Sequence, residues 1–162
     1  MQPILIVKLI VLLSIANGSP VFAKKIFGGR FSWPVDGGCA FVDGRPLFGS
    51  AKTIRGVLFS VVLATAAAPL LGLEAANGAL VGSMAMAGDL FSSFVKRRLN
   101  FPPSSRAMGL DQIPESLFPL LAWRAWLPLG TIDILICVSV FLVGQVVLSP
   151  ILYRIGVRDQ PF

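Results

Sequence analysis

Apolar residues occur in five long runs along the chain, and polar or charged segments separate one run from the next. A run of about 20 apolar residues is long enough to cross a hydrocarbon core of about 30 Å as a helix. The runs predict membrane-spanning helices at residues 3–22, 56–73, 75–95, 113–128 and 131–153. The pattern therefore predicts an all-α integral membrane protein in which residues 1–162 form a single domain without a separate soluble module.

The composition agrees with this pattern. Hydrophobic residues make up 55% of the chain and charged residues only 14%, and the mean hydropathy is +0.80. An ordinary soluble domain of this length carries more charge and is less apolar. The formal charge of +6 lies mainly between the predicted spans, and no basic patch is interleaved with exposed aromatic residues, so we expect no binding of nucleic acid.

The first apolar run allows two interpretations. The Val-Phe-Ala at 21–23 and the two lysines that follow are typical of a cleavage site behind a signal peptide. The run is longer than the about 7 to 15 residues of a signal core and lacks a basic cluster at its amino end, which favours an uncleaved helix. Asn17 and Pro20 are expected either to cap this helix or to bend it, and a bend would let freed backbone groups line a cavity.

Two other runs have unusual compositions. The run at 113–128 is shorter than a standard span and contains two prolines, Glu115 and Arg124, so it predicts a tilted helix, a broken helix or a re-entrant segment. The run at 75–95 is rich in Gly, Ala, Ser and Met. Because small residues let helices approach closely, this helix is expected at the centre of the bundle.

Cations are concentrated in two predicted loops, 23–55 and 96–112, whereas the connections at 74–78 and 128–132 contain none. Positively charged loops stay on the cytoplasmic side of a membrane. Both loops and the carboxyl terminus are therefore expected in the cytoplasm and the amino terminus outside, in a protein of the cell (inner) membrane. The cations counted are Lys24, Lys25, Arg30, Arg45, Lys52, Arg55, Lys96, Arg97, Arg98, Arg106, Arg154 and Arg158.

The first of these loops is rich in glycine, with turn signals at Asp36-Gly37 and Asp43-Gly44, and predicts a folded segment with a short hairpin. Lys52 and Arg55 lie three residues apart where this loop meets the next span, close enough to bind one polyphosphate together. Ordinary positive charge on the cytoplasmic side explains them equally well. The glycines and lysine here do not match a P-loop, because two extra residues intervene and no strand precedes them.

Asp89 lies within a predicted membrane helix, where a charge costs about 2.5 to 3.5 kcal/mol and usually faces a partner, an ion or water. Helical spacing places it near one face with Ser93, Lys96 and Arg97. Carboxylates beside several cations suit a nucleotide bound with Mg²⁺, because the metal takes oxygen ligands and the cations neutralise the phosphates. A polar site on the cytoplasmic face of the bundle is therefore expected.

Other chemistries are excluded by composition. The chain contains no histidine, which rules out His-dependent acid–base and nucleophilic schemes. Cys39 falls in a loop and Cys137 in an apolar run, so the two cysteines predict neither a disulfide nor a zinc site.

Short polar motifs follow one another along the chain: Asn17-x2-Pro20-Val21, Asp43-Gly44-Arg45-Pro46, Gly49-x2-Lys52-Thr53-x-Arg55-Gly56, Gly88-Asp89-Leu90, Ser93-Phe94-x-Lys96-Arg97-Arg98 and Leu110-Asp111-Gln112. In this order they resemble the CDP-archaeol synthase family of membrane CTP-dependent cytidylyltransferases, which is related to the phosphatidate cytidylyltransferases. The resemblance covers most of the chain. It implies that a lipid phosphate attacks the α-phosphorus of CTP, giving a CDP-lipid and pyrophosphate in phospholipid biosynthesis with Mg²⁺ required.

The resemblance also implies roles for single residues. Asp89 and Asp111 would hold the metal and, together with Lys96, form the catalytic set. The remaining residues would bind the nucleotide and its phosphates: Lys52, Thr53, Arg55, Lys96, Arg97 and Arg98, with Asp43 and Arg45 as nucleotide or structural contacts. The implied partners are CTP, a lipid phosphate acceptor and membrane lipids.

The chain lacks the Gly-His-Gly-Gly-x2-Asp-Arg-x-Asp ending of the phosphatidate enzymes. The acceptor lipid therefore stays open between an archaeal di-geranylgeranyl glycerol phosphate, a related bacterial lipid phosphate and another lipid. The sequence does not determine the oligomeric state. A small transporter with Asp89 in its pathway and a non-catalytic lipid-binding protein are alternatives. The absence of an internal repeat and the clustering of charge at one interface favour the enzyme over the transporter.

Overall fold

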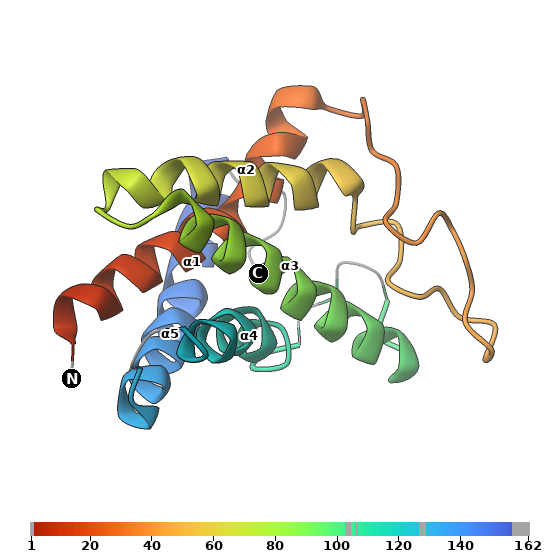
Figure 1. Cartoon of the computed structure of the whole chain (residues 1–162). Helices are drawn as coiled ribbons and strands as arrows, with labels where there is room; N and C mark the ends of the chain where they lie inside the picture. Colours follow the sequence, from red (N-terminus) through yellow and green to blue (C-terminus); the bar gives the residue numbers. More distant parts are fainter. Residues whose placement is uncertain (1, 103–104, 106, 127–128, 157–162) are drawn as a thin grey trace.

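The computed structural model describes residues 2–102, 105, 107–126 and 129–156. The described part contains five α-helices and, apart from two isolated bridges, no β-structure, so the all-α prediction is confirmed (Figure 1). The helices are α1 (Pro3–Phe27), α2 (Ile54–Leu70), α3 (Ala75–Arg98), α4 (Gln112–Arg124) and α5 (Thr131–Arg154). Arg106 and Arg158, which the orientation argument counted, lie outside the described residues.

Three helices, α1, α3 and α5, have the length and composition to cross a membrane, whereas α2 is an apolar helix of 17 residues. α4 has 13 residues, which extend about 20 Å at 1.5 Å per residue. It therefore differs from the predicted span at 113–128, because it ends at Arg124 and is too short to cross a core of about 30 Å. Residues 127–128 of that prediction lie outside the described part of the chain.

Turn geometry explains where two helices end. α2 stops before Gly72, whose φ of 67° closes a Schellman turn, so the helix does not reach the predicted boundary at residue 73. α3 continues to Arg98 instead of ending at 95, and Asn100, with φ of 63°, closes the same kind of turn. There the N–H of Phe101 donates to the carbonyl of Lys96 at 2.9 Å. The basic residues expected to open a loop thus form the last turn of a helix.

α1 passes through Pro20 and ends at Phe27 rather than at residue 22. Proline has no N–H, so the carbonyl of Ala16, four residues earlier, lacks its donor within the helix. The hydroxyl of Ser60 on α2 donates to this carbonyl at 2.7 Å, and both residues are buried. A neighbouring helix thus replaces the missing hydrogen bond, and α1 continues to Phe27, whose ring packs against Phe59 of α2.

α3 packs between α2 and α4 and also contacts α1. Its glycines leave no room for a side chain at two of these contacts. A Cβ added to Gly78 would lie 2.2 Å from the carbonyl oxygen of Ala64 on α2, and one added to Gly88 would lie 2.2 Å from that of Pro114 on α4. The prediction that small residues place this helix centrally is confirmed, because they let its backbone approach both neighbours.

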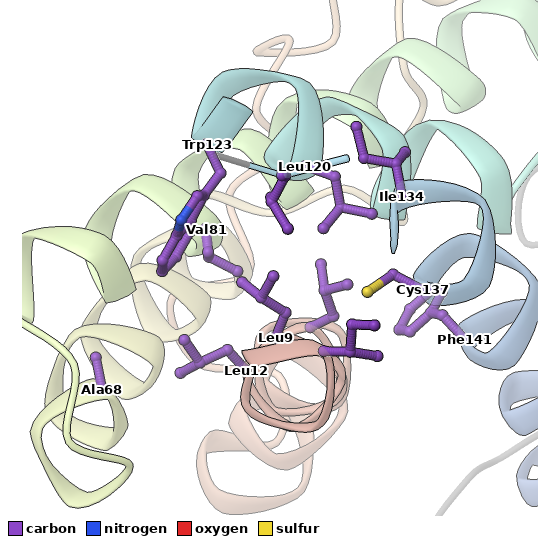
Figure 2. Close-up of a cluster of buried hydrophobic side chains, with 12 residues drawn as sticks. Leu9, Leu12, Ala68, Val81, Leu120, Trp123, Ile134, Cys137 and Phe141 are labelled. Carbon is purple, nitrogen blue, oxygen red and sulfur yellow. The ribbon is translucent and has the colours of Figure 1, made fainter. Parts of the chain in front are cut away.

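A hydrophobic cluster holds the bundle together where α1, α4 and α5 meet (Figure 2). Leu9 of α1 lies among Trp123 of α4 and Cys137 and Phe141 of α5, all of them buried. Cys137 is a free thiol inside this cluster and Cys39 is free and exposed, as the sequence predicts. Lipid is as apolar as these side chains, so the cluster stabilises the bundle through close van der Waals packing.

Replacing Ser60 by alanine should leave the carbonyl of Ala16 buried without a donor, which costs about 1 to 3 kcal/mol. We expect a lower midpoint of thermal unfolding in detergent. Thr65→Ala is the matched control, because its hydroxyl bonds to the carbonyl of Val61 within its own helix at 2.7 Å. Equal midpoints for the two variants would contradict the proposed role of Ser60.

Replacing Gly88 by alanine should force α3 and α4 apart, because the new methyl group would overlap the backbone of Pro114. Overpacking of this kind costs about 1 to 3 kcal/mol. Gly144→Ala on α5 is the control, since nothing lies within 4 Å of a Cβ there and alanine favours a helix. Thermal unfolding should show a loss for the first variant and none for the second.

Candidate active site

Six polar side chains meet at the end of the bundle where α3 and α4 face the start of α2. They come from α1, from the residues before α2, from α3 and from the start of α4. We call them the polar cluster: Asn17, Lys52, Asp89, Lys96, Asp111 and Glu115. The cluster joins residues from four separate segments of the chain, and its charges are close enough to influence one another.

Lys52 and Asp89 form the first ion pair of the cluster. The Nζ atom of Lys52 lies 2.5 Å and 2.6 Å from the two carboxylate oxygens of Asp89. Burial alone would lower the pKa of Lys52, but the negative charges of Asp89 and Glu115 outweigh it and raise that pKa above its usual range. The costly charge on α3 therefore has a partner of opposite sign, as its place in an apolar helix predicts.

Glu115 completes this side of the cluster. Its carboxyl group lies within hydrogen-bonding distance of that of Asp89, and the Nδ2 atom of Asn17 donates to its Oε2 at 2.5 Å. Two carboxyl groups in contact are stable when they share a proton or a cation, because two bare negative charges would repel each other. The arrangement is therefore suited to holding a cation between them.

Lys96 and Asp111 form the second ion pair, with 2.7 Å between Nζ and Oδ1. Lys96 also donates to the carbonyl of Ser105 at 3.0 Å, and the other oxygen of Asp111 accepts the N–H of Ala107 at 3.0 Å. These contacts hold the segment between α3 and α4 over the end of α3. The structure thus brings together Lys96 and Asp111, two residues that the resemblance assigns to one site.

Arg97 lies beside this pair and is only 5% exposed. Its Nη2 donates to the carbonyl of Pro102 at 2.9 Å. Its Nε and Nη1 are buried and have no hydrogen-bond partner among the residues that the structure describes. A buried guanidinium with two unused donors is suited to binding an anion.

The loop at 28–53 is fixed by Asp36, whose buried carboxylate accepts three backbone N–H groups. Gly38 donates to Oδ1 at 3.0 Å, while Phe48 and Gly49 donate to Oδ2 at 3.0 Å and 2.9 Å. Burial opposes ionisation of Asp36, but these hydrogen bonds outweigh it and lower its pKa below the ordinary value. One carboxylate thus connects two distant parts of the loop.

Lys52 is positioned by the backbone of this loop. The carbonyl of Lys52 accepts the N–H of Val35 at 2.8 Å, and the N–H of Ile54 donates to the carbonyl of Trp33 at 3.0 Å. These bonds flank the isolated bridge between residues 34 and 53. The side chain of Thr53, predicted to bind phosphate, accepts the N–H of Gly56 at 3.3 Å and so caps α2.

Three other predicted ligands of the nucleotide contact one another instead of the polar cluster. Arg98 pairs with Asp43 at 2.6 Å, and its guanidinium lies 4.9 Å and 5.0 Å from the ring centroids of Phe41 and Phe94. Arg45 donates to the carbonyl of Arg98 at 2.6 Å. These residues attach the predicted hairpin, which the structure closes with a bridge between residues 40 and 46, to the end of α3.

Arg55 also has a partner away from the polar cluster, since its guanidinium donates to the carbonyl of Arg30. Lys52, three residues earlier, faces Asp89 instead. The structure thus brings Lys52, Asp89, Lys96 and Asp111 together from the predicted set, and it gives the others local structural contacts. Their binding roles stay predictions.

The sequence analysis gave no site role to Asn17, although it belongs to one of the motifs, or to Glu115. Both were visible as polar residues in apolar runs, one at a predicted helix bend and one beside a proline. Such residues in a membrane helix usually face a partner or a cavity. Only the packing of α1 against α4 shows that these two face each other.

The described helices and the polar cluster define a class of protein. It is an all-helical membrane protein with a charge-paired site at one end of the bundle, which is the arrangement expected of an intramembrane enzyme. A family model described as "CarS-like: CDP-archaeol synthase" matches residues 2–77 and 73–162. The chain belongs to the CDP-archaeol synthase family.

Individual relatives agree with this assignment. The CDP-archaeol synthase of Pyrobaculum calidifontis is 36% identical over 145 residues, covering 86% of this chain and 81% of the relative. That of Thermococcus onnurineus is 37% identical over 166 residues, covering 91% and 89%. A solved structure described as an intramembrane enzyme for archaeal membrane lipid biosynthesis matches with a TM-score of 0.72 and 28% identity, over 85% of this chain and 90% of that one. The chain is therefore a nucleotidyltransferase that performs CTP-dependent cytidylyl transfer to a lipid phosphate.

Replacing Asp36 by asparagine should loosen the loop at 28–53. Because the folded-state pKa of Asp36 lies below its unfolded value of about 4, its stabilising effect is present above that pH and is lost as the pH falls through the folded-state pKa. We expect faster hydrogen exchange at Phe48 and Gly49 at neutral pH. The difference from the wild type should shrink below about pH 4, and a difference independent of pH would contradict this role.

Proposed function

We propose that the polar cluster is the place where CTP and the phosphate of a membrane lipid react, on the cytoplasmic side of the cell membrane with the amino terminus outside. An oxygen of the lipid phosphate attacks the α-phosphorus of CTP, and the bond to pyrophosphate breaks. A phosphate monoester is already ionised at neutral pH, so the step needs no histidine as a base. Its main demands are positioning and neutralisation of charge.

Mg²⁺ fits the cluster best between Asp89 and Glu115. The contact between these two carboxyl groups supports this assignment, because a shared cation would remove their repulsion. No three His, Cys, Asp or Glu side chains within the described residues form a metal-binding group, so the phosphates would supply further ligands, as Mg²⁺ commonly requires. When bound, the metal would withdraw charge from the reacting phosphates. Asp111, which the resemblance gives as a metal ligand together with Asp89, stays a prediction.

The two lysines of the cluster are placed to neutralise the phosphates. Without substrate, Lys52 is paired with Asp89 and Lys96 with Asp111. A nucleotide with its metal brings charges of both signs, so each lysine can exchange a carboxylate for a phosphate while the carboxylate gains a cation. The two lysines, together with Arg97, then offset part of the net negative charge that the metal-bound nucleotide brings into the buried site.

Arg97 is proposed to bind a phosphate of CTP beside Lys96. Its two buried nitrogens without a partner in the described part of the chain support this role. An arginine holds phosphate oxygens with two parallel hydrogen bonds, whereas a lysine acts as a point charge. The leaving group, pyrophosphate, contains two linked phosphates, so the neighbouring cations Lys96 and Arg97 can each bind one of them.

The acceptor we propose is an isoprenoid glycerol phosphate of the archaeal type. The relatives named as CDP-archaeol synthases support this choice, since they match over most of their length and of this chain. The single observation that carries the proposed site is the ion pair of Lys52 and Asp89, which joins the loop before α2 to the central helix inside the bundle.

Replacing Asp89 by asparagine should abolish turnover while leaving the side chain's shape intact. We expect release of pyrophosphate from CTP, Mg²⁺ and an isoprenoid glycerol phosphate to fall by about 100-fold or more, because a buried charge that acts on the reacting group is lost. Purified protein in detergent or liposomes serves for the assay. CTP binding measured in parallel, with ATP as competitor, separates lost binding from lost chemistry.

Glu74→Gln is the matched control, because it removes a carboxylate at the opposite end of α3. Its turnover should equal that of the wild type. If wild-type protein binds no CTP and releases no pyrophosphate with any lipid phosphate, the proposed function fails. Unchanged turnover in Asp89→Asn would move the reaction away from this cluster.

A further inference from the structure

The segment at 21–33, which we call the interfacial segment, combines exposed aromatic side chains with several cations. It includes the last turns of α1 and the turn that follows it. The 25 residues of α1 extend about 37 Å at 1.5 Å per residue, more than a hydrocarbon core of about 30 Å requires. The orange end of α1 lies at the edge of the bundle (Figure 1), beside the start of α2.

The apolar side chains of this segment point outward. Phe22 and Ile26 are one helical turn apart and exposed, whereas Ala23 between them is buried. In the following turn Phe31 is 59% exposed and Trp33 is 67% exposed. Large apolar side chains exposed together indicate a surface that is covered by a partner.

The rings are held in fixed positions. Phe31 packs edge to face against Phe27 and Trp33, with 6.2 Å between centroids in each pair, and Phe27 packs against Phe59 of α2 at 5.8 Å. Phe31 has a φ of 56°, which costs a non-glycine residue conformational energy. The ring of Phe31 is thus exposed in a backbone conformation that is unfavourable for phenylalanine.

The charged side chains of the interfacial segment are all cations, and one of them, Lys25, donates to the carbonyl of Gly156 at 2.8 Å. The chain contains no Asp or Glu before Asp36, while Lys24, Lys25 and Arg30 belong to the segment itself. Arg55 joins them, because its guanidinium donates to the carbonyl of Arg30. Aromatic rings with a basic fringe are complementary to the boundary between anionic headgroups and acyl chains, where tryptophan and phenylalanine are favoured.

We propose that the interfacial segment lies along the membrane surface, with Phe22, Ile26, Phe31 and Trp33 in the headgroup and acyl boundary and its cations among anionic lipid headgroups. Trp33, at the end of this segment, accepts the N–H of Ile54 through its carbonyl. This hydrogen bond helps to position the backbone next to Lys52. The membrane surface would therefore fix the start of the loop that carries a residue of the polar cluster. This contact needs neither CTP nor turnover and is independent of the proposed function.

The test uses the fluorescence of Trp33 in the full chain reconstituted into liposomes. The fluorescence of Trp33 is obtained by subtracting the fluorescence of Trp33→Phe from that of the wild type. The buried Trp123 therefore need not be replaced. We expect Trp33 to be quenched by brominated phosphatidylglycerol severalfold more than by the same fraction of brominated phosphatidylcholine, and poorly by aqueous iodide. In Lys24→Gln/Arg30→Gln the preference for the anionic lipid should disappear.

Trp126→Phe is the matched control, because Trp126 is exposed but lies after α4, outside the interfacial segment. The quenching of Trp126 fluorescence, obtained by the same subtraction, should be unchanged when Lys24 and Arg30 are replaced. Quenching of Trp33 by iodide and not by brominated lipid would overturn the proposal, and so would equal quenching by the two lipids. Protection from both quenchers would indicate a protein partner, such as a second copy of the chain, and would overturn it as well.

Discussion

The cost of burying charge is the constraint on which the structure depends. Asp89 lies on the central helix, and its charge is tolerable there because Lys52 reaches it from the loop before α2. The same requirement joins Lys96 to Asp111 across the segment between α3 and α4. Each ion pair therefore both neutralises a charge and fixes one of the long connections to the helices. The site and the fold of its loops are products of the same interactions.

Pro20 inside α1 is the second condition for this arrangement. It removes a helical hydrogen bond, and Ser60 of α2 restores it from outside at Ala16. Asn17 lies one residue beyond that carbonyl and reaches Glu115 on α4. Docking of α2 beside the proline thus stabilises the part of α1 that contributes to the polar cluster. A helix without this proline would satisfy its own backbone and would not need α2 at this point.

The sequence predicted the helices well because their signals are local. Apolar length marks α1, α3 and α5, and the small residues of α3 predict its close packing on both neighbours. The ends of the helices were predicted less well, because Asn100 closes α3 by adopting a left-handed conformation that composition does not show. The same limit applies to α4, whose apolar run continues in the sequence beyond the last helical residue, Arg124.

The candidate site was predicted in part for the same reason. Charges spaced along one helix, such as Asp89 and Lys96, can be placed together from helical periodicity. The partner of Glu115 depends on how α1 and α4 pack, which is information that spacing along the chain does not contain. Loop residues such as Arg45 and Arg98 carried the same basic signal as Lys52, yet they attach a hairpin to α3.

The division between lysines and arginines has a physical basis. Arg98 uses its planar group to contact two rings, a carboxylate and backbone carbonyls together, which suits a fixed structural contact. Lys52 and Lys96 carry compact charges on flexible stems, and neither is held by aromatic rings as well as hydrogen bonds. In the proposed site the lysines are therefore the side chains that exchange partners when a charged substrate enters, while Arg45 and Arg98 hold the hairpin in place.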